Sequence, residues 1–131
     1  MFLTRECDYA IRVVRALADM EKKPMKIICE QEQIPRPFAY KILKKLKNNG
    51  IVHSLRGAEG GYQLKKNPNL ITLFDVVNAM DERLFLSDCL EQGYVCSHNS
   101  NGNICRLHQE LGRLQILLMD KFREKTINQF I

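Results

Sequence analysis

Apolar and polar residues alternate with a helical period in the N-terminal third of this 131-residue chain. The spacing predicts a first helix over about residues 5–20, with Thr4 as its N-cap, and a short second helix over about 27–32. After a turn, Pro37 suits the first position of a third helix, where its missing N–H costs nothing, and residues 48–50 supply the stop. The three segments predict a helix-turn-helix.

The period then changes to that of strands. Residues 51–55 alternate, residues 62–64 can return antiparallel to them, and the glycine-rich residues 56–61 connect the two. Thr72 and Asp75 have the spacing of a capping box that opens a further helix over about 73–80. Helices followed by a hairpin are the order of a winged helix-turn-helix. We therefore expect a mainly α fold with a small β-hairpin wing.

A last helical pattern predicts a long amphipathic helix that ends near residue 125. Its apolar positions are Leu107, Leu111, Leu114, Leu117, Leu118 and Phe122. Such a helix could pack on its own head, but major-groove readers usually work as symmetric dimers, so we expect a homodimer. The predicted division is a DNA-binding domain over 1–82, a ligand-rich loop over 83–105, and a dimerisation helix with its tail over 106–131.

Composition places the chain among ordinary globular proteins, with 45% hydrophobic and 27% charged residues. It has neither an apolar run of about 18 residues nor a signal-peptide pattern, which predicts a cytoplasmic protein with no membrane partner. Five cysteines, an odd number, argue against a secreted disulfide framework.

Positive charge is concentrated in the first part of the chain. Residues 1–80 have a net charge of +6 and residues 81–131 of −1. Between Arg36 and Lys66 there are eight basic residues and one acid, Glu59. Such a field attracts a polyanion and predicts binding to double-stranded DNA, with a solvated lysine face as the alternative.

In a winged helix the third helix enters the major groove with its N-terminal residues nearest the bases. The contact candidates on it are Arg36, Phe38, Ala39, Tyr40 and Lys41, with Lys44, Lys45 and Lys47 for phosphates. Phe38 is better explained as a core residue than as a base contact. On the wing, Arg56 suits a narrow minor groove, and Gly57 and Gly60 permit close approach.

Three cysteines and a histidine follow in the pattern Cys89-x6-Cys96-x8-Cys105-x2-His108. Thiolates are the usual ligands of iron–sulfur clusters, and histidine or an oxygen donor can complete the set. The spacings are wider than the close pairs of structural zinc sites, so a cluster is favoured over zinc or no metal. Cys29, on the second helix, is interpreted as a buried structural thiol.

Four motifs together resemble the IscR/NsrR family of winged-helix transcription regulators over nearly the whole chain. They are residues 3–10 (LT followed by YA), 55–64 (LRGAEGGYQL), 71–77 (ITLFDVV) and the three-cysteine loop that begins with Asp88, Cys89 and Leu90. The resemblance implies a homodimer joined by the long C-terminal helix. It also implies a [4Fe-4S] or [2Fe-2S] cluster held by Cys89, Cys96 and Cys105, and control of genes for cluster assembly, iron supply or nitrosative stress.

The fourth ligand divides this family. Members close to the cluster-biogenesis regulator use a histidine at the Cys-x2-His position, which is His108 here. The nitric-oxide sensors present an aspartate on the first helix, matched by Asp8, that reaches the cluster of the other subunit. The position of Asp8 relative to residues 3–4 favours Asp8, with His108 as the alternative and His98 as a third candidate.

The sequence thus predicts a DNA-binding regulator, such as a repressor, whose operator affinity is controlled by a cluster that senses iron or cluster status, redox or nitric oxide. No nucleophile–base pair, phosphate-cradling loop or cofactor fingerprint is present, so neither an enzyme nor a small-molecule substrate is expected. The alternative is a zinc-bound or metal-free winged helix that binds DNA or acts as an adaptor.

Overall fold

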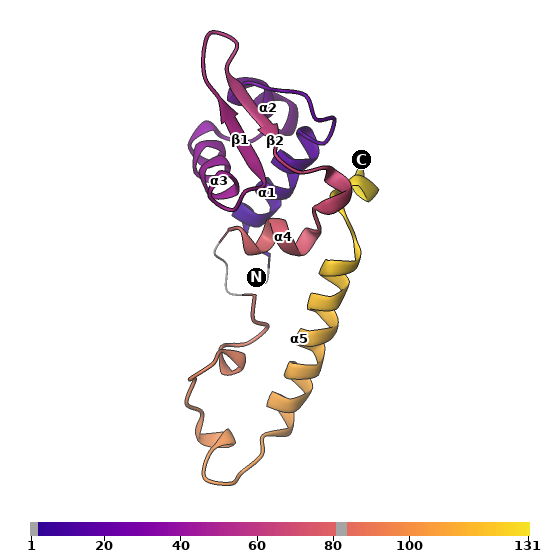
Figure 1. The fold of residues 1–131 in the computed structure, drawn as a ribbon. Coiled ribbons are helices and arrows are strands. Elements are labelled where there is room, and N and C mark those ends of the chain that lie inside the picture. The colour runs from indigo at the N-terminus through magenta and orange to yellow at the C-terminus, as the bar shows by residue number, and fades with distance from the viewer. Residues whose placement is uncertain (1–2, 81–83) are drawn as a thin grey trace.

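The computed structural model describes residues 3–80 and 84–131. It divides into a head, made of the N-terminal helices and the hairpin, and an arm that extends from it (Figure 1). The elements are α1 (Arg5–Ala16), α2 (Met25–Glu32), α3 (Arg36–Asn48), β1 (Val52–Leu55), β2 (Gly61–Leu64), η1 (Pro68–Leu70), α4 (Leu73–Asn78), η2 (Asp88–Leu90), η3 (Ser97–Asn99), α5 (Arg106–Glu124) and η4 (Ile127–Phe130). The predicted order of helices and hairpin is confirmed.

The helix α1 begins as predicted but ends earlier. The Thr4 hydroxyl accepts a hydrogen bond from the Cys7 N–H at 3.2 Å, which confirms the N-cap. The predicted end near residue 20 is wrong, because Met20 adopts a left-handed φ of 66°. The turn brings Lys23 alongside the hairpin, where its backbone exchanges hydrogen bonds of 2.8 and 2.9 Å with Tyr62. The chain therefore leaves the helix and pairs with the wing, although the apolar spacing predicted a helix as far as residue 20.

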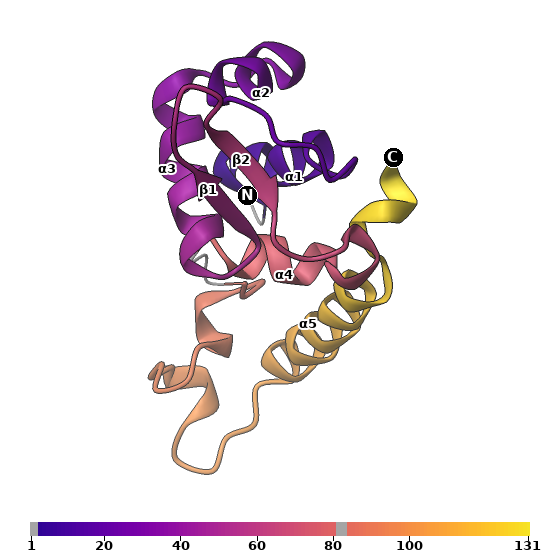
Figure 2. The ribbon, with the colours of Figure 1, turned by 45° about the horizontal axis from the view of Figure 1, so that its top comes forward.

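The wing is a two-stranded antiparallel sheet in which Val52 pairs with Leu64 and Leu55 with Gly61. Its strand β1 lies beside α3 in both views of the fold (Figures 1 and 2). Beneath them, the core is formed by side chains that α1, α2, α3 and α4 bury against the strands. Its fully buried members include Val13, Leu17, Ile28, Ile42, Leu43, Leu46, Val52 and Leu64. Burial of this apolar set, rather than helix propensity, stabilises the short helices.

The predicted capping box of α4 is confirmed. The Thr72 hydroxyl accepts from the Asp75 N–H at 3.1 Å, and the Asp75 carboxylate accepts from the Thr72 N–H at 2.9 Å. The boundary predicted between residues 82 and 83 lies outside the described residues. The predicted start of the long helix near 106 agrees with α5.

The C-terminal tail returns to the head, which the sequence did not indicate. Ile127 is buried in the core, and its N–H donates to the Ile71 carbonyl at 2.8 Å. The guanidinium of Arg123 lies 4.1 Å from the centre of the Phe74 ring. The last turn of α5 is therefore held by the head, and the arm is not a freely moving helix.

Gly61→Ala is expected to destabilise the protein by about 1–3 kcal/mol. A Cβ at this position would lie 2.6 Å from the Lys23 carbonyl oxygen, which belongs to the backbone and cannot move aside cheaply. The matched control is Gly112→Ala in α5, where the nearest atom would be 3.8 Å away and alanine favours the helix. Thermal unfolding should show a lowered Tm for the first variant only, and equal Tm values would contradict this account.

Candidate nucleic-acid interface and metal centre

A cavity of about 530 Å³ lies between the cysteine-rich loop and the start of α5. Its lining includes Cys89, Cys96, Cys105, His98, His108 and Leu111. The three thiols that the sequence singled out therefore line one cavity, together with two of the three candidates for the fourth ligand. Asp8 of the same chain is not among the lining residues.

Local hydrogen bonds place the cysteines at the cavity. Cys105 is the N-cap of α5, and its sulfur accepts from the His108 N–H at 3.4 Å. The Cys105 N–H in turn donates to the Asn99 side chain at 3.2 Å. Ser87 Oγ lies 3.4 Å from Cys89 Sγ. A thiolate at Cys105 would face the positive end of the helix dipole, which suits a metal ligand.

The side-chain amide of one residue of α5, Gln115, fixes the start of the cysteine-rich loop. Gln115 accepts a hydrogen bond from the Leu86 N–H at 2.7 Å and donates to the Leu84 carbonyl. The sequence analysis missed this residue. The sequence feature that could have indicated its role is a polar side chain one helical turn after Leu111, within the apolar stripe of the helix.

The side chain of His108 carries an unsatisfied polar atom. Its Nδ1 is buried and has no hydrogen-bond partner within residues 3–80 and 84–131. A buried polar atom without a partner costs free energy, and native proteins satisfy nearly all such atoms. His98, by contrast, is exposed. His108 lines the same cavity as the three thiols, and one nitrogen of its ring is unsatisfied within the described residues.

Within the described parts of the chain, no three His, Cys, Asp or Glu side chains converge closely enough to hold a metal ion. A single tetrahedral zinc ion requires such convergence, since its sulfur ligands all lie about 2.3 Å from one centre. In a cluster each thiolate can bind a different iron, so the ligands stand further apart. The three thiols that line the cavity are soft donors of the kind that bind iron–sulfur clusters.

Asp8 lies on the surface of the head. Its carboxylate is 3.0 Å from Arg12 Nη2, and its side chain is 53% exposed. It could bind a cluster only in another copy of the chain, as the resemblance implied for the nitric-oxide sensors.

The two remaining cysteines lie away from the cavity. Cys7 is buried in the core of the head. Cys29, which we expected to be buried, is half-buried on α2. Burial raises the pKa of the Cys29 thiol, and the positive charge of Arg36 partly offsets the shift. Cys29 therefore favours the protonated thiol and is a poor candidate ligand.

The exposed face of α3 carries Arg36, Tyr40, Lys41 and Lys44, as expected for a groove reader. Two expectations need correction. Ala39 has no exposed surface and belongs to the core, so its side chain cannot contact DNA. Phe38 was expected in the core but is 43% exposed, and its ring packs edge-on against Tyr9 with centroids 5.6 Å apart.

Lys45 is engaged inside the head. Its ammonium lies 2.8 Å from a carboxylate oxygen of Glu6 and donates to the Met80 carbonyl at 3.0 Å. Lys41 approaches the same carboxylate at 3.6 Å. Because Lys45 already has two partners and its side chain is only 22% exposed, the phosphate contact predicted for it is not supported. It connects α3 to α1 and to the end of α4.

On the wing, Arg56 and Gly57 are exposed. The hairpin itself requires the two glycines, for different reasons. Gly57 has a φ of 111°, which side chains rarely adopt, while a Cβ at Gly60 would lie 2.7 Å from the Leu55 carbonyl oxygen. Arg56 therefore lies at the start of a turn whose backbone depends on both glycines.

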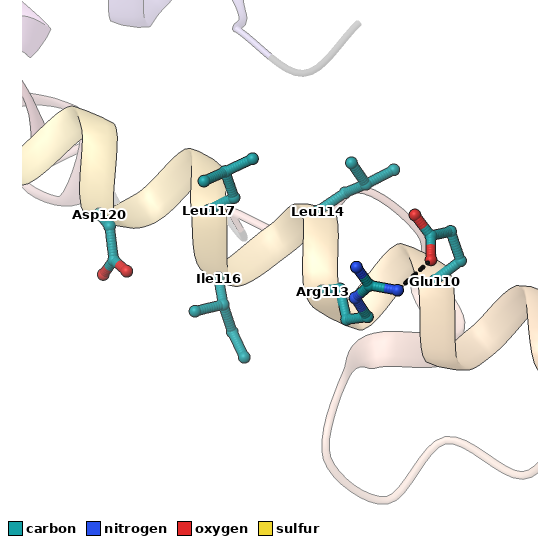
Figure 3. Close-up of a pocket in the computed structure, with 6 residues that line it drawn as sticks. All are labelled: Glu110, Arg113, Leu114, Ile116, Leu117 and Asp120. Atoms are coloured by element: carbon teal, nitrogen blue, oxygen red, sulfur yellow. Dashed lines mark hydrogen bonds and ion pairs between the residues drawn. The ribbon is translucent and has the colours of Figure 1, made fainter.

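The apolar stripe of α5 divides into two parts. Leu111, Leu118 and Phe122 are half-buried, whereas Leu107, Leu114 and Leu117 are 66%, 43% and 58% exposed. Leu114 and Leu117 project from one side of the helix, and the Arg113–Glu110 ion pair lies beside them (Figure 3). No helix within the described residues has both the length and the apolar character to span a membrane.

Comparison with known proteins identifies the group to which this chain belongs. The Rrf2 family, described as iron-dependent transcriptional regulators, matches residues 3–131. The chain belongs to the Rrf2 family. The IscR regulator of Pectobacterium atrosepticum is 33% identical over 134 aligned positions, which cover 100% of this chain and 79% of that protein. IscR of Escherichia coli O1:K1 is 30% identical over 71% of this chain and 59% of its own length.

Solved structures agree in fold. T. potens IscR has a TM-score of 0.76 at 18% identity, covering 98% of this chain and 84% of its own. CymR of B. subtilis, described as its global cysteine regulator, has a TM-score of 0.78 at 20% identity, covering 98% and 94%. The expected resemblance and the winged-helix fold are confirmed. This Rrf2 protein is a DNA-binding transcriptional regulator, and its relatives are regulators rather than enzymes.

Proposed function

We propose that this Rrf2 protein is a cytoplasmic homodimer that binds operator DNA through α3 and the wing, and that an iron–sulfur cluster controls its affinity. The observation that carries the proposal is the cavity that three cysteines and His108 line together. The basic, exposed face of α3 supports the DNA contact. Arg36 and Tyr40 near its N-terminus, with Arg56 on the wing, are the proposed base and groove contacts.

The proposed ligands are Cys89, Cys96, Cys105 and His108. His108 replaces Asp8 as the favoured fourth ligand because it lines the cavity together with the three cysteines, whereas Asp8 pairs with Arg12 on the surface. A bound cluster supplies a redox-active centre whose state can report oxygen, nitric oxide or iron supply. Cys105 would bind it from the N-terminus of α5, and Gln115 fixes the backbone at the start of the cysteine-rich loop.

One side chain of α3 and one of its C-cap bind the backbone that follows α4. Lys45 holds the Met80 carbonyl, and the Asn49 amide donates to the Ala79 carbonyl at 3.3 Å. Both carbonyls belong to residues that precede the cysteine loop in the sequence, so we propose that a change in that loop acts on these contacts of α3. Such coupling needs a differential free energy of about 1–3 kcal/mol between the two states.

The exposed leucines of α5 support the homodimer. A lone amphipathic helix is marginal in water, and burial against a second copy would cover Leu107, Leu114 and Leu117. Two heads related by this contact would read two half-sites of one operator. In this proposal, residues 106–131 form the dimerisation segment that joins the two copies.

The fourth ligand can be assigned with a pair of variants. His108→Ala is expected to lower the iron and acid-labile sulfide of anaerobically purified protein several-fold, because one of four ligands is lost. Asp8→Ala is expected to leave both contents unchanged, since it removes only a surface ion pair. The opposite result would assign the ligand to Asp8 of a second copy and contradict the His108 assignment.

A metal-free winged-helix regulator is the second candidate. It is favoured by the absence of a converged three-donor group within residues 3–80 and 84–131. The likeness to CymR, named for cysteine regulation, also means that the fold alone does not specify a cluster. Elemental analysis of the anaerobic protein separates the candidates: iron with equimolar sulfide supports the cluster, whereas neither iron nor sulfide supports the metal-free protein.

A further inference from the structure

A polar hollow of about 230 Å³ lies between α3 and the wing, apart from the cysteine cavity. Six residues line it: Tyr40, Lys44, Lys47, Asn48, Ser54 and Tyr62. The first four recur at the spacing of a single helix face. Ser54 and Tyr62 are directly opposite each other in the β1–β2 register. Figure 2 shows β1 running alongside α3. The lining residues come from α3 and from both strands of the wing.

The lining is rich in hydrogen-bond donors and contains no carboxylate. It offers two ammonium groups, two phenol hydroxyls, a serine hydroxyl and an amide. In the part of the chain that the structure describes, neither Lys44 nor Lys47 has an ion-pair partner, whereas Glu6 engages Lys41 and Lys45. Lys41 and Lys45 of α3 thus share Glu6 as a partner, whereas Lys44 and Lys47 line this hollow.

We propose that the hollow binds one phosphate of the DNA backbone. An ionised phosphate forms its strongest hydrogen bonds with charged donors, and Lys44 and Lys47 supply them while Tyr62 and Ser54 donate from the wing. The inference rests on the proposed DNA binding and adds the residues that fix its register. A phosphate held by helix and wing together would set the positions of Arg36 and Arg56 relative to their grooves.

The backbone of Tyr62 pairs with that of Lys23. Backbone pairing leaves the phenol hydroxyl free to line the hollow. Tyr62→Phe removes that hydroxyl and keeps the ring, and Lys47→Gln removes one charge from an exposed side chain. Both variants should fold, which equal thermal unfolding curves would verify.

The test measures affinity for a mixed-sequence DNA duplex at several salt concentrations, with all proteins purified anaerobically in the same way. Lys47→Gln is expected to weaken binding about tenfold and to reduce the slope of log K against log salt by about 1, because one phosphate is no longer neutralised. Tyr62→Phe should weaken binding about tenfold without changing the slope, since it removes a neutral donor. Lys121→Gln is the matched control: it also removes one charge, but from α5, where Lys121 pairs with Glu124 at 3.0 Å.

The outcomes separate this inference from the proposed function. A wild-type protein that fails to bind the duplex overturns DNA binding itself. Wild-type binding with Lys47→Gln and Tyr62→Phe both indistinguishable from Lys121→Gln overturns the hollow alone. A hollow made for a free anion would give thermal protection by inorganic phosphate that Lys47→Gln abolishes, with unchanged DNA binding, and that result also overturns the inference.

Discussion

Replacing Cys89, Cys96 and Cys105 together with serine is expected to leave anaerobically purified protein almost without iron and sulfide. Serine keeps the shape of the side chain but removes the thiolate that iron requires. The three residues line one cavity, so their loss removes most of the donor set at once. Operator affinity should then shift by about 5- to 150-fold relative to the wild type, the range of ordinary allosteric coupling.

The matched control for this variant is Cys29→Ser. Cys29 is half-buried on α2 and does not line the cavity, so its replacement should leave iron, sulfide and DNA affinity unchanged. Iron and sulfide are counted per chain, and affinity is measured by a gel-shift titration. If the triple variant retained its iron, or lost it without any change in operator affinity, the sensing role proposed for the loop would be wrong.

Leu114→Glu combined with Leu117→Glu is expected to convert the protein to a monomer. The two leucines project from one exposed side of α5, and burying each against a second copy would stabilise the dimer by about 1.5–3 kcal/mol per side chain. A symmetric contact contains both residues twice, so four glutamates would meet across it. Light scattering should show half the wild-type mass, and operator affinity should fall by at least about 100-fold because only one half-site can be held.

Leu70→Glu provides the control for this change. Leu70 lies on η1 of the head and is 71% exposed, so it receives the same substitution without touching the face of α5. It should remain dimeric and bind DNA as the wild type does. A double variant that stays dimeric would show that the copies associate through another surface.

The sequence was informative wherever a local rule decides the structure. The N-cap at Thr4 and the capping box of Thr72 and Asp75 depend on residues three positions apart, and both form as expected. The glycine-rich connection of the hairpin and the amphipathic helix α5 were also predicted from the sequence. Spacing alone also grouped the three cysteines that line one cavity.

Expectations failed where a distant residue intervenes. The end of α1 is set by the pairing of Lys23 with Tyr62, almost forty positions away. Lys45 was assigned to phosphate because it lies on a basic helix, yet Glu6 and the Met80 carbonyl occupy it. Helical periodicity also could not separate Ala39, which faces the core, from Phe38 beside it, which does not.

By itself, then, the amino-acid order determined the winged-helix fold, the basic helix and the set of thiol donors, since each depends on near neighbours or on periodic burial. Within the described residues, only the tertiary structure decided that Glu6 pairs with Lys41 and Lys45, that His108 Nδ1 is buried without a hydrogen-bond partner, and that Ile127 returns to the core. Those features depend on contacts between segments far apart along the chain. Their free energies come from mutual burial and pairing, which spacing along one segment does not report.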